Sequence, residues 1–177
     1  MKKFLTISLS IILACFGVAK AQVTGTTSVH VKLVDILALT VNNSDVNINF
    51  NNASDYQNGV TVAMPGHLTV TSNQPYTLNV KAAGNLAGTG ANTDVLDPSV
   101  LTVALPTTGN NTTLGAVPTT ASGLSTTNAA LVTSATPGLL KLLDVNYTVP
   151  SSVSTTSALL GKKADTYTTT VTYTITQ

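Results

Sequence analysis

Two histidines, His30 and His67, are the side chains of this 177-residue sequence best suited to general-base chemistry near neutral pH. Nucleophilic catalysis requires such a base to lie against a nucleophile and to be oriented by a third group. His30 falls on the polar side of a predicted strand, and His67 directly follows a Met-Pro-Gly turn. We therefore interpret both as polar residues of the surface or of a sheet face, and we expect no enzymatic activity.

Two other patterns could carry chemistry. Leu105–Gly109 reads Leu-Pro-Thr-Thr-Gly, the letters of the signal by which sortases anchor proteins to cell walls. That signal needs an apolar span and basic residues behind it, which are missing here, so we interpret the pattern as a strand end followed by a proline turn. Asp94 and Asp97 lack the regular ligand spacing of a calcium loop and are predicted to cap turns. No metal or cofactor is expected.

The first 21 residues have the composition of a secretory signal. Two lysines precede a short apolar run, and Ala19-Lys20-Ala21 matches the small-x-small pattern of a cleavage site, which would leave Gln22 at the mature N-terminus. Cys15 follows Ile-Leu-Ala, so lipid anchoring at this cysteine is a minor alternative. We expect an exported protein of the periplasm, the cell surface or the medium, with no membrane span in the mature chain.

The composition of the chain excludes several classes of protein. Only 8% of the residues are charged, against about 25% in ordinary soluble domains, and arginine, glutamate and tryptophan are absent. The five lysines and seven aspartates that remain after cleavage form no basic surface, so we expect no binding of nucleic acid. With 43% hydrophobic residues the chain is not of the disordered type. The only cysteine lies in the signal, so the mature domain is predicted to fold without a disulfide.

Period-two alternation of apolar and polar residues dominates the mature chain and predicts β-strands. We expect strands over 28–41, 45–50, 60–64, 67–71, 76–80, 99–105, 142–149 and 167–175. Roughly eight short strands with turn signals between them predict an all-β domain over 22–177, a single antiparallel β-sandwich of immunoglobulin-like architecture. A closed barrel is the alternative. The Thr/Ser/Gly/Asn-rich segment 107–137 is either a long loop or contains two weak strands, around 114–117 and 129–133; because loops of this length are uncommon, some strand is expected within it.

The last predicted strand is the most informative segment. Tyr167, Val171, Tyr173 and Ile175 share one side, and every even position from 166 to 176 is threonine. A strand of β-branched and aromatic residues without charge or proline is prone to aggregate when its edge is free. We therefore take these four residues as candidates for strand pairing between subunits.

This strand resembles the closing strand of bacterial pilin-like and spore-coat-U-like secreted domains. It also resembles the end of WxL-type cell-surface domains, where Tyr173-Thr174-Ile175 stands in the place of Trp-x-Leu. The stretch 68–82 is similar to a mid-domain hairpin of these families. The resemblance covers about a fifth of the chain and implies a non-enzymatic, surface-associated sandwich. The cysteine pair frequent in pilin-like domains and the tryptophan of the WxL type are both missing.

Together these observations predict a structural or adhesive protein, a fimbria-like or coat-like subunit that associates with itself or with other surface subunits through its first or last strand. The alternative is a non-covalent cell-wall or polysaccharide-binding module. That alternative predicts an exposed strip of aromatic side chains, for which six residues are available in the mature chain: Phe50, Tyr56, Tyr76, Tyr147, Tyr167 and Tyr173.

Overall fold

The computed structural model describes residues 22–177. The predicted signal, including Cys15, lies outside the described residues. A compact unit spans Val34–Gln177, and residues 22–33 stand outside it without helix or strand. None of the helices in 22–177 has the length and hydropathy needed to span a bilayer.

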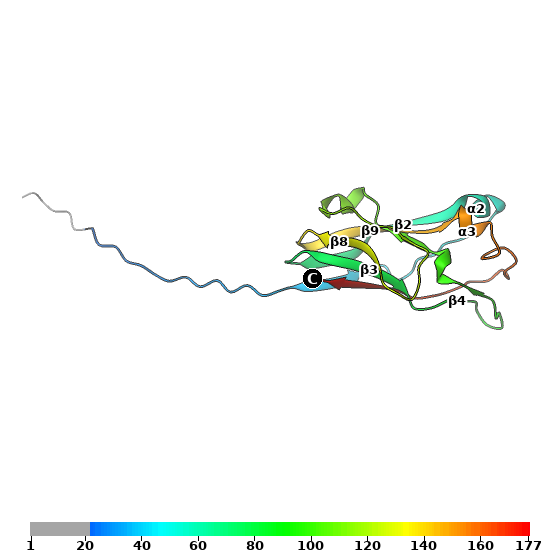
Figure 1. Cartoon of the computed structure of the whole chain (residues 1–177), viewed down its shortest axis with the longest axis horizontal. Helices are drawn as coiled ribbons and strands as arrows, with labels where there is room; N and C mark the ends of the chain where they lie inside the picture. The colour runs from blue at the N-terminus through cyan, green and yellow to red at the C-terminus, as the bar shows by residue number, and fades with distance from the viewer. Residues whose placement is uncertain (1–21) are drawn as a thin grey trace, which may run out of the picture. The chain divides into compact units, whose positions relative to one another are not determined.

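The compact unit is mostly β and its sheets are antiparallel, which confirms the all-β prediction (Figure 1). The first sheet has the order β1 (Leu37–Val41), β2 (Gly59–Ser72), β9 (Gly138–Pro150), β6 (Thr102–Ala104) and β7 (Ala121–Ser122). The second has the order β10 (Val171–Thr176), β3 (Tyr76–Ala82) and β8 (Ala129–Ala135). Neither sheet closes into a barrel, because each ends in two different edge strands.

Short elements connect these strands. β4 (Leu86–Ala87) and β5 (Val95–Leu96) form a two-stranded ribbon. The helical pieces are α2 (Ala53–Asn58), α3 (Ser151–Ser154) and the single 3₁₀ turns η1 (Pro98–Val100) and η2 (Gly109–Thr113). The described residues thus hold ten strands rather than about eight, and three of the ten are only two residues long.

One apolar core is shared by the two sheets. Alternate side chains of β3 are buried, beginning with Tyr76, and alternate side chains of β9 are buried from Leu143 to Val149. Both sets belong to the same cluster. Because successive residues of a strand face opposite sides, the period-two pattern of the sequence directly decides which side chains the two sheets enclose.

β2 is a single strand where two were predicted. Pro65-Gly66 was expected to end the strand at 60–64, yet β2 runs without interruption to Ser72 beside β9. The disturbance takes the form of a bulge: Met64 pairs with Val145 and Leu68 with Leu143, so three residues stand opposite Asp144 alone. A proline or glycine inside a strand often marks such a bulge rather than a strand end.

The first predicted strand is wrong over its first half. Residues 28–36 form no strand, and β1 begins only at Leu37. Three apolar residues of that half, Val29, Val31 and Leu33, are more than three-quarters exposed. Alternation alone does not form a strand, because the backbone also needs a neighbouring strand with which to exchange hydrogen bonds.

Residues 45–50 differ from prediction in another way. Val46, Ile48 and Phe50 face the core as expected, but the backbone around them joins neither sheet. The segment 107–137 contains β8 where a strand was expected around 129–133. The weak strand expected around 114–117 is absent, and the 3₁₀ turn η2 ends just before Leu114. Here the apolar pattern predicts the direction of side chains, and backbone pairing depends on the neighbours.

The shared core generates a first test. Leu78 of β3 is fully buried, so Leu78→Ala should lower the free energy of unfolding by about 2–5 kcal/mol through lost burial and the cavity left behind. Urea denaturation followed by circular dichroism measures this loss. Leu139→Ala is the matched control, because Leu139 is 69% exposed and its truncation should change stability by less than about 0.5 kcal/mol. Equal losses for the two variants would contradict the shared core.

Candidate functional site

β1 and β10 are the edge strands of the two sheets on one side of the domain. They lie close together there, since the Gln177 side chain after β10 donates from Nε2 to the Ile36 carbonyl before β1 at 3.0 Å and to Ser72 Oγ at 2.9 Å. β1 pairs only with β2, and β10 only with β3. Each strand therefore has one backbone edge without a sheet partner in the described part of the chain. We call this side of the domain the open side.

The inner face of β1 is exposed on the open side. Leu37, Leu39 and Val41 pair with Ser72, Val70 and Leu68 of β2 and share their inward direction. The three β2 residues are fully buried, whereas Leu37 and Val41 remain 40% and 45% exposed. The second sheet stops at β10 and does not extend far enough to cover them. Exposed apolar side chains on the core-facing side of a sheet indicate that a covering strand is missing.

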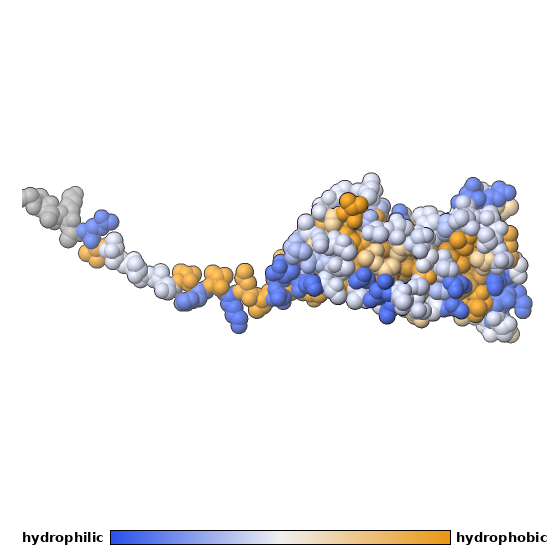
Figure 2. All heavy atoms as spheres, in the orientation of Figure 1, coloured by the Kyte–Doolittle hydropathy of each residue, from blue (hydrophilic) through white to orange (hydrophobic). Residues whose placement is uncertain are grey.

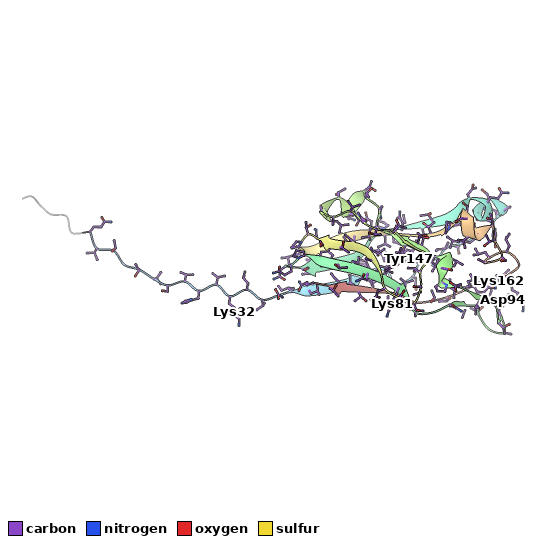
Figure 3. The ribbon with its side chains drawn as sticks, in the orientation of Figure 1. Lys32, Lys81, Asp94, Tyr147 and Lys162 are labelled. Atoms are coloured by element: carbon purple, nitrogen blue, oxygen red, sulfur yellow. The ribbon has the colours of Figure 1, made fainter. Side chains whose placement is uncertain are left out.

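A second exposed apolar set precedes β1. Val29, Val31 and Leu33 alternate with His30 and Lys32 in a segment whose side chains are all exposed. Figure 2 shows this alternation of orange and blue along the segment, and Figure 3 labels Lys32 on it. Residues 34–36 are held by one side chain: Asn73 Oδ1 accepts from Ile36 N–H at 2.8 Å, and Asn73 Nδ2 donates to the Val34 carbonyl at 2.8 Å.

The four residues predicted for strand pairing all face the core of their own domain. Val171, Tyr173 and Ile175 lie in β10 and are partly buried against the core, whereas Tyr167 lies before the strand. The Tyr167 hydroxyl donates to the Lys163 carbonyl at 2.8 Å and accepts from Asn92 at 3.2 Å. Any further strand would therefore meet the free backbone edge of β10 rather than these four side chains. Their assembly role stays a prediction.

Tyr173 ends a chain of buried polar groups that joins the two sheets. His67 Nε2 of β2 lies 2.9 Å from the Tyr147 hydroxyl of β9, and that hydroxyl lies 2.5 Å from the Tyr173 hydroxyl of β10. The imidazole packs edge-on against both phenol rings, with centroid distances of 5.5 and 6.0 Å. Figure 3 shows Tyr147 inside the domain. We call these three residues the His67–Tyr147–Tyr173 chain.

His67 is only 2% exposed, so the interpretation of His67 as a surface or sheet-face residue is wrong. Strict alternation along β2 would turn it outward, but the bulge at Pro65-Gly66 rotates its side chain toward the core next to Leu68. His67 Nδ1 and the Tyr76 hydroxyl are the buried side-chain polar atoms without a hydrogen-bond partner in residues 22–177. Burial lowers the pKa of His67 and raises the pKa values of Tyr147 and Tyr173.

Asp144 fixes the bulge that places His67. Its Oδ1 accepts from Gly66 N–H at 2.7 Å, where Gly66 has the left-handed φ of 58°. The carboxylate also accepts from the backbone and the side chain of Asn110, at 2.9 and 2.6 Å. Burial raises the pKa of Asp144, but the bonds from Gly66 and Asn110 outweigh that effect and leave it below the usual range.

The catalytic candidates do not form a catalytic arrangement. His30 is exposed on the segment before β1, and the partner of His67 is a phenol rather than a carboxylate. An open pocket at the end of the domain where Figure 3 labels Asp94 and Lys162 is lined mainly by serine, threonine and small apolar residues, without either histidine. Leu105 of the Leu-Pro-Thr-Thr-Gly pattern is buried just after β6, as expected of a strand end.

The aspartates of the predicted turns act as caps. Asp97 Oδ1 accepts from Ser99 N–H at the start of η1, and Asp94 Oδ2 accepts from Lys163 N–H at 3.0 Å. Asp165 accepts from Thr89 and from Asn92, which ties the loop before β5 to the segment before β10. Within residues 22–177 no three His, Cys, Asp or Glu side chains gather in a way that would hold a metal ion.

The aromatic side chains form no exposed strip. Tyr76 and Tyr147 are buried, and the other four aromatic residues of the described chain are partly buried. Phe50 and Tyr56 stack against each other with ring centroids 4.9 Å apart. Flat exposed rings of the kind that bind sugar faces are thus missing from this part of the chain.

Comparison with known proteins gives no further assignment, because no protein-family model matches the chain and no curated protein is significantly similar to it.

The bulge generates a test of the site. Asp144→Ala removes the acceptor of Gly66 and Asn110 and should lower the free energy of unfolding by about 1–3 kcal/mol. It should also broaden the NMR signals of the His67 ring, because the turn that orients the ring is released. Asp45→Ala is the control, since Asp45 is exposed and accepts no hydrogen bond in the structure. If Asp144→Ala leaves the free energy of unfolding unchanged, the bulge does not depend on the Asp144 carboxylate, which would contradict this role.

Proposed function

We propose that this protein is an exported structural subunit that assembles with copies of itself by β-strand addition. In this proposal residues 1–21 direct export and are removed, and the rest of the chain is an immunoglobulin-like sandwich that lacks one edge strand. Residues 28–33 of one copy supply that strand to the next copy. The observation that carries the proposal is the exposed alternation of Val29, Val31 and Leu33 in a chain whose domain leaves apolar strand face uncovered.

The donor segment has the sequence of a strand and lacks only a partner. Three apolar side chains on one side, more than three-quarters exposed, would each gain about 1.5–3 kcal/mol from full burial. Their backbone groups would gain the hydrogen bonds of a ladder. A chain that leaves such a segment in water is prone to associate, so the segment needs a definite partner to avoid disordered aggregation.

The open side has the shape that the donor segment requires. A strand paired to the free edge of β10 would extend the second sheet by one position, about 4.8 Å. It would then lie opposite the inner face of β1 and cover Leu37, Leu39 and Val41. β10 is six residues long, which matches the six residues 28–33. Backbone pairing would bind the donor, and burial of alternate side chains would fix its register.

A second copy is a better source of this strand than the same chain. The donor segment leads directly into β1, and Asn73 holds residues 34–36 between them. Between Val29 and Ile36 the one turn-forming residue is Asp35, and it lies inside the stretch 34–36 that Asn73 binds, so a reversal of the chain there would break those hydrogen bonds. Addition in trans needs no such reversal. Each copy that donates one segment also offers one open side, so the contact can repeat from subunit to subunit.

The scarcity of charge supports assembly rather than binding of a polymer. With 8% charged residues, copies of the domain repel one another little. The cell-wall or polysaccharide-binding alternative finds no support among the described aromatic residues, none of which is exposed. We therefore propose a non-enzymatic surface or coat role with the chain itself as the partner.

Two single substitutions separate donor from acceptor. Val31→Asp places a charge on the apolar side of the donor segment, and Val41→Asp places one on the exposed inner face of β1. Each variant of the chain from Gln22 should be monomeric at concentrations where the parent chain forms dimers and larger species. A 1:1 mixture should form heterodimers only, because Val41→Asp still donates and Val31→Asp still accepts. Size-exclusion chromatography with light scattering measures these species.

The matched controls change the opposite parity of the same strands. His30→Asp and Thr40→Asp introduce the same charge on exposed side chains that face away from the apolar sides, so both should assemble as the parent chain does. A parent chain that is monomeric at high concentration, or a mixture that yields no heterodimer, would contradict strand addition. Circular dichroism confirms that each variant keeps its β-structure.

A further inference from the structure

We propose that neutral His67 is a pH-sensitive contact that holds β10 against the first sheet, and that mild acid loosens β10 by protonating it. The His67–Tyr147–Tyr173 chain carries the proposal. Its effect on assembly rests on the proposed function, because β10 would be the strand to which a second copy adds. The effect on β10 itself does not depend on assembly.

The chain is a buried polar connection between two layers that also meet through apolar packing and, at the end of β10, through the Gln177 side chain. His67 and Tyr147 belong to the two central strands of the first sheet, and Tyr173 lies in the middle of β10. β10 has a sheet neighbour on one side only. Its side chains Val171 and Ile175 are partly buried rather than buried. An edge strand with few other attachments depends strongly on each one that it has.

Protonation of His67 would break this arrangement. Nε2 is occupied by the Tyr147 hydroxyl, and Nδ1 has no partner. When Nε2–H donates to Tyr147, the hydroxyl of Tyr147 can donate to Tyr173, and Nδ1 keeps an unused lone pair. A proton added at Nδ1 would be a buried cationic N–H without an acceptor, which is strongly unfavourable.

The groups that face the imidazole cannot compensate this charge. From β9 and β10 these are the phenols of Tyr147 and Tyr173, which are neutral at this pH. The Asp144 carboxylate is engaged with Gly66 and Asn110. Lys81 of β3 alternates with the buried Val80 and Ala82 and so faces away from the core. Lys141 of β9 is bound to Thr113 and Thr136.

The direction of the pH effect follows from linkage. When β10 opens, His67 meets water and binds a proton with the ordinary pKa of 6.5, whereas burial lowers its pKa in the closed state. The open state therefore binds more protons near and below pH 6.5, and the rise of the opening equilibrium approaches about tenfold per pH unit well below pH 6.5, until the pH reaches the lowered pKa. Above about pH 7 the effect vanishes. The hydrogen bonds to the Asp144 carboxylate are lost only when it is protonated, which happens below the ordinary aspartate pKa of 3.8 because its own pKa is lowered.

Amide hydrogen exchange between pH 4.5 and 7.5, corrected for the intrinsic rate, measures the opening of β10 at those residues of 171–176 whose N–H groups bond to β3. In the chain from Gln22 carrying Val31→Asp, opening should rise from pH 6.5 to 5.5 by up to about fivefold, because the open-state imidazole is already half protonated at pH 6.5. His67→Gln added to that chain keeps an N–H donor but does not titrate, so its opening should not depend on pH in this range. His30→Gln is the matched control and should behave as the parent does, because His30 is exposed.

An NMR titration of the His67 ring is a second measurement that needs no variant at His67. It should show a pKa for the His67 ring below the ordinary histidine value of 6.5, because burial disfavours the charged ring. A His67 ring that protonates at or above pH 6.5 would overturn the proposal. So would opening of β10 that does not depend on pH in the Val31→Asp chain that keeps His67. The Val31→Asp background separates the two proposals. If β10 opens in a pH-dependent way but the variants form no heterodimers, only the strand-addition proposal is contradicted. If the variants form heterodimers but the opening of β10 does not depend on pH, only the proposed role of His67 is contradicted.

Discussion

An apolar strand face is stable only where a second layer covers it, and this domain has more apolar strand face than its own two sheets cover. The first sheet begins with β1, whose inner side chains Leu37 and Val41 are partly exposed because the second sheet ends at β10. Just before β1 the same chain carries Val29, Val31 and Leu33, which are exposed in a segment without a strand partner. Uncovered apolar strand face and an exposed segment with strand-like alternation therefore occur in one molecule.

This imbalance relates the other features of the chain to one another. The exposed segment 28–33, with its strand-like alternation, is prone to associate with other chains. The nearly uncharged composition adds to this, because copies of the domain repel one another little. In the proposed assembly this segment would add to the free edge of β10 in one register only, because burial of its alternate side chains would fix the register. β10 is central to this arrangement because it carries the free edge, and it is attached to the opposite sheet through Tyr173 and the buried His67. In the proposed pH response, the stability of this edge depends on the protonation of His67.

Prediction from the sequence succeeded where the period-two rule acted alone. Tyr76, Leu78 and Val80 are buried as their alternation indicates, and so are the odd residues of β9 from Leu143. Prediction failed where the structure of a segment depends on residues outside that segment. The residues 28–36 have strand-like alternation but no neighbouring edge, and His67 is buried because a bulge breaks the alternation. Pro65-Gly66 was the one signal in the sequence that could have indicated that bulge.

The sequence by itself determined the β class, the parity of most core side chains, the absence of cysteine after residue 15 and the strand-like character of 28–41 and 167–175. These are local properties, because alternation and composition need no knowledge of distant residues. Only the tertiary structure decided which edges remain free, which apolar faces remain uncovered, and that His67, Tyr147 and Tyr173 meet although 80 and 26 residues separate them along the chain. Pairing and layering depend on contacts between distant segments, and a one-dimensional pattern contains no information about which of those contacts are left unmade.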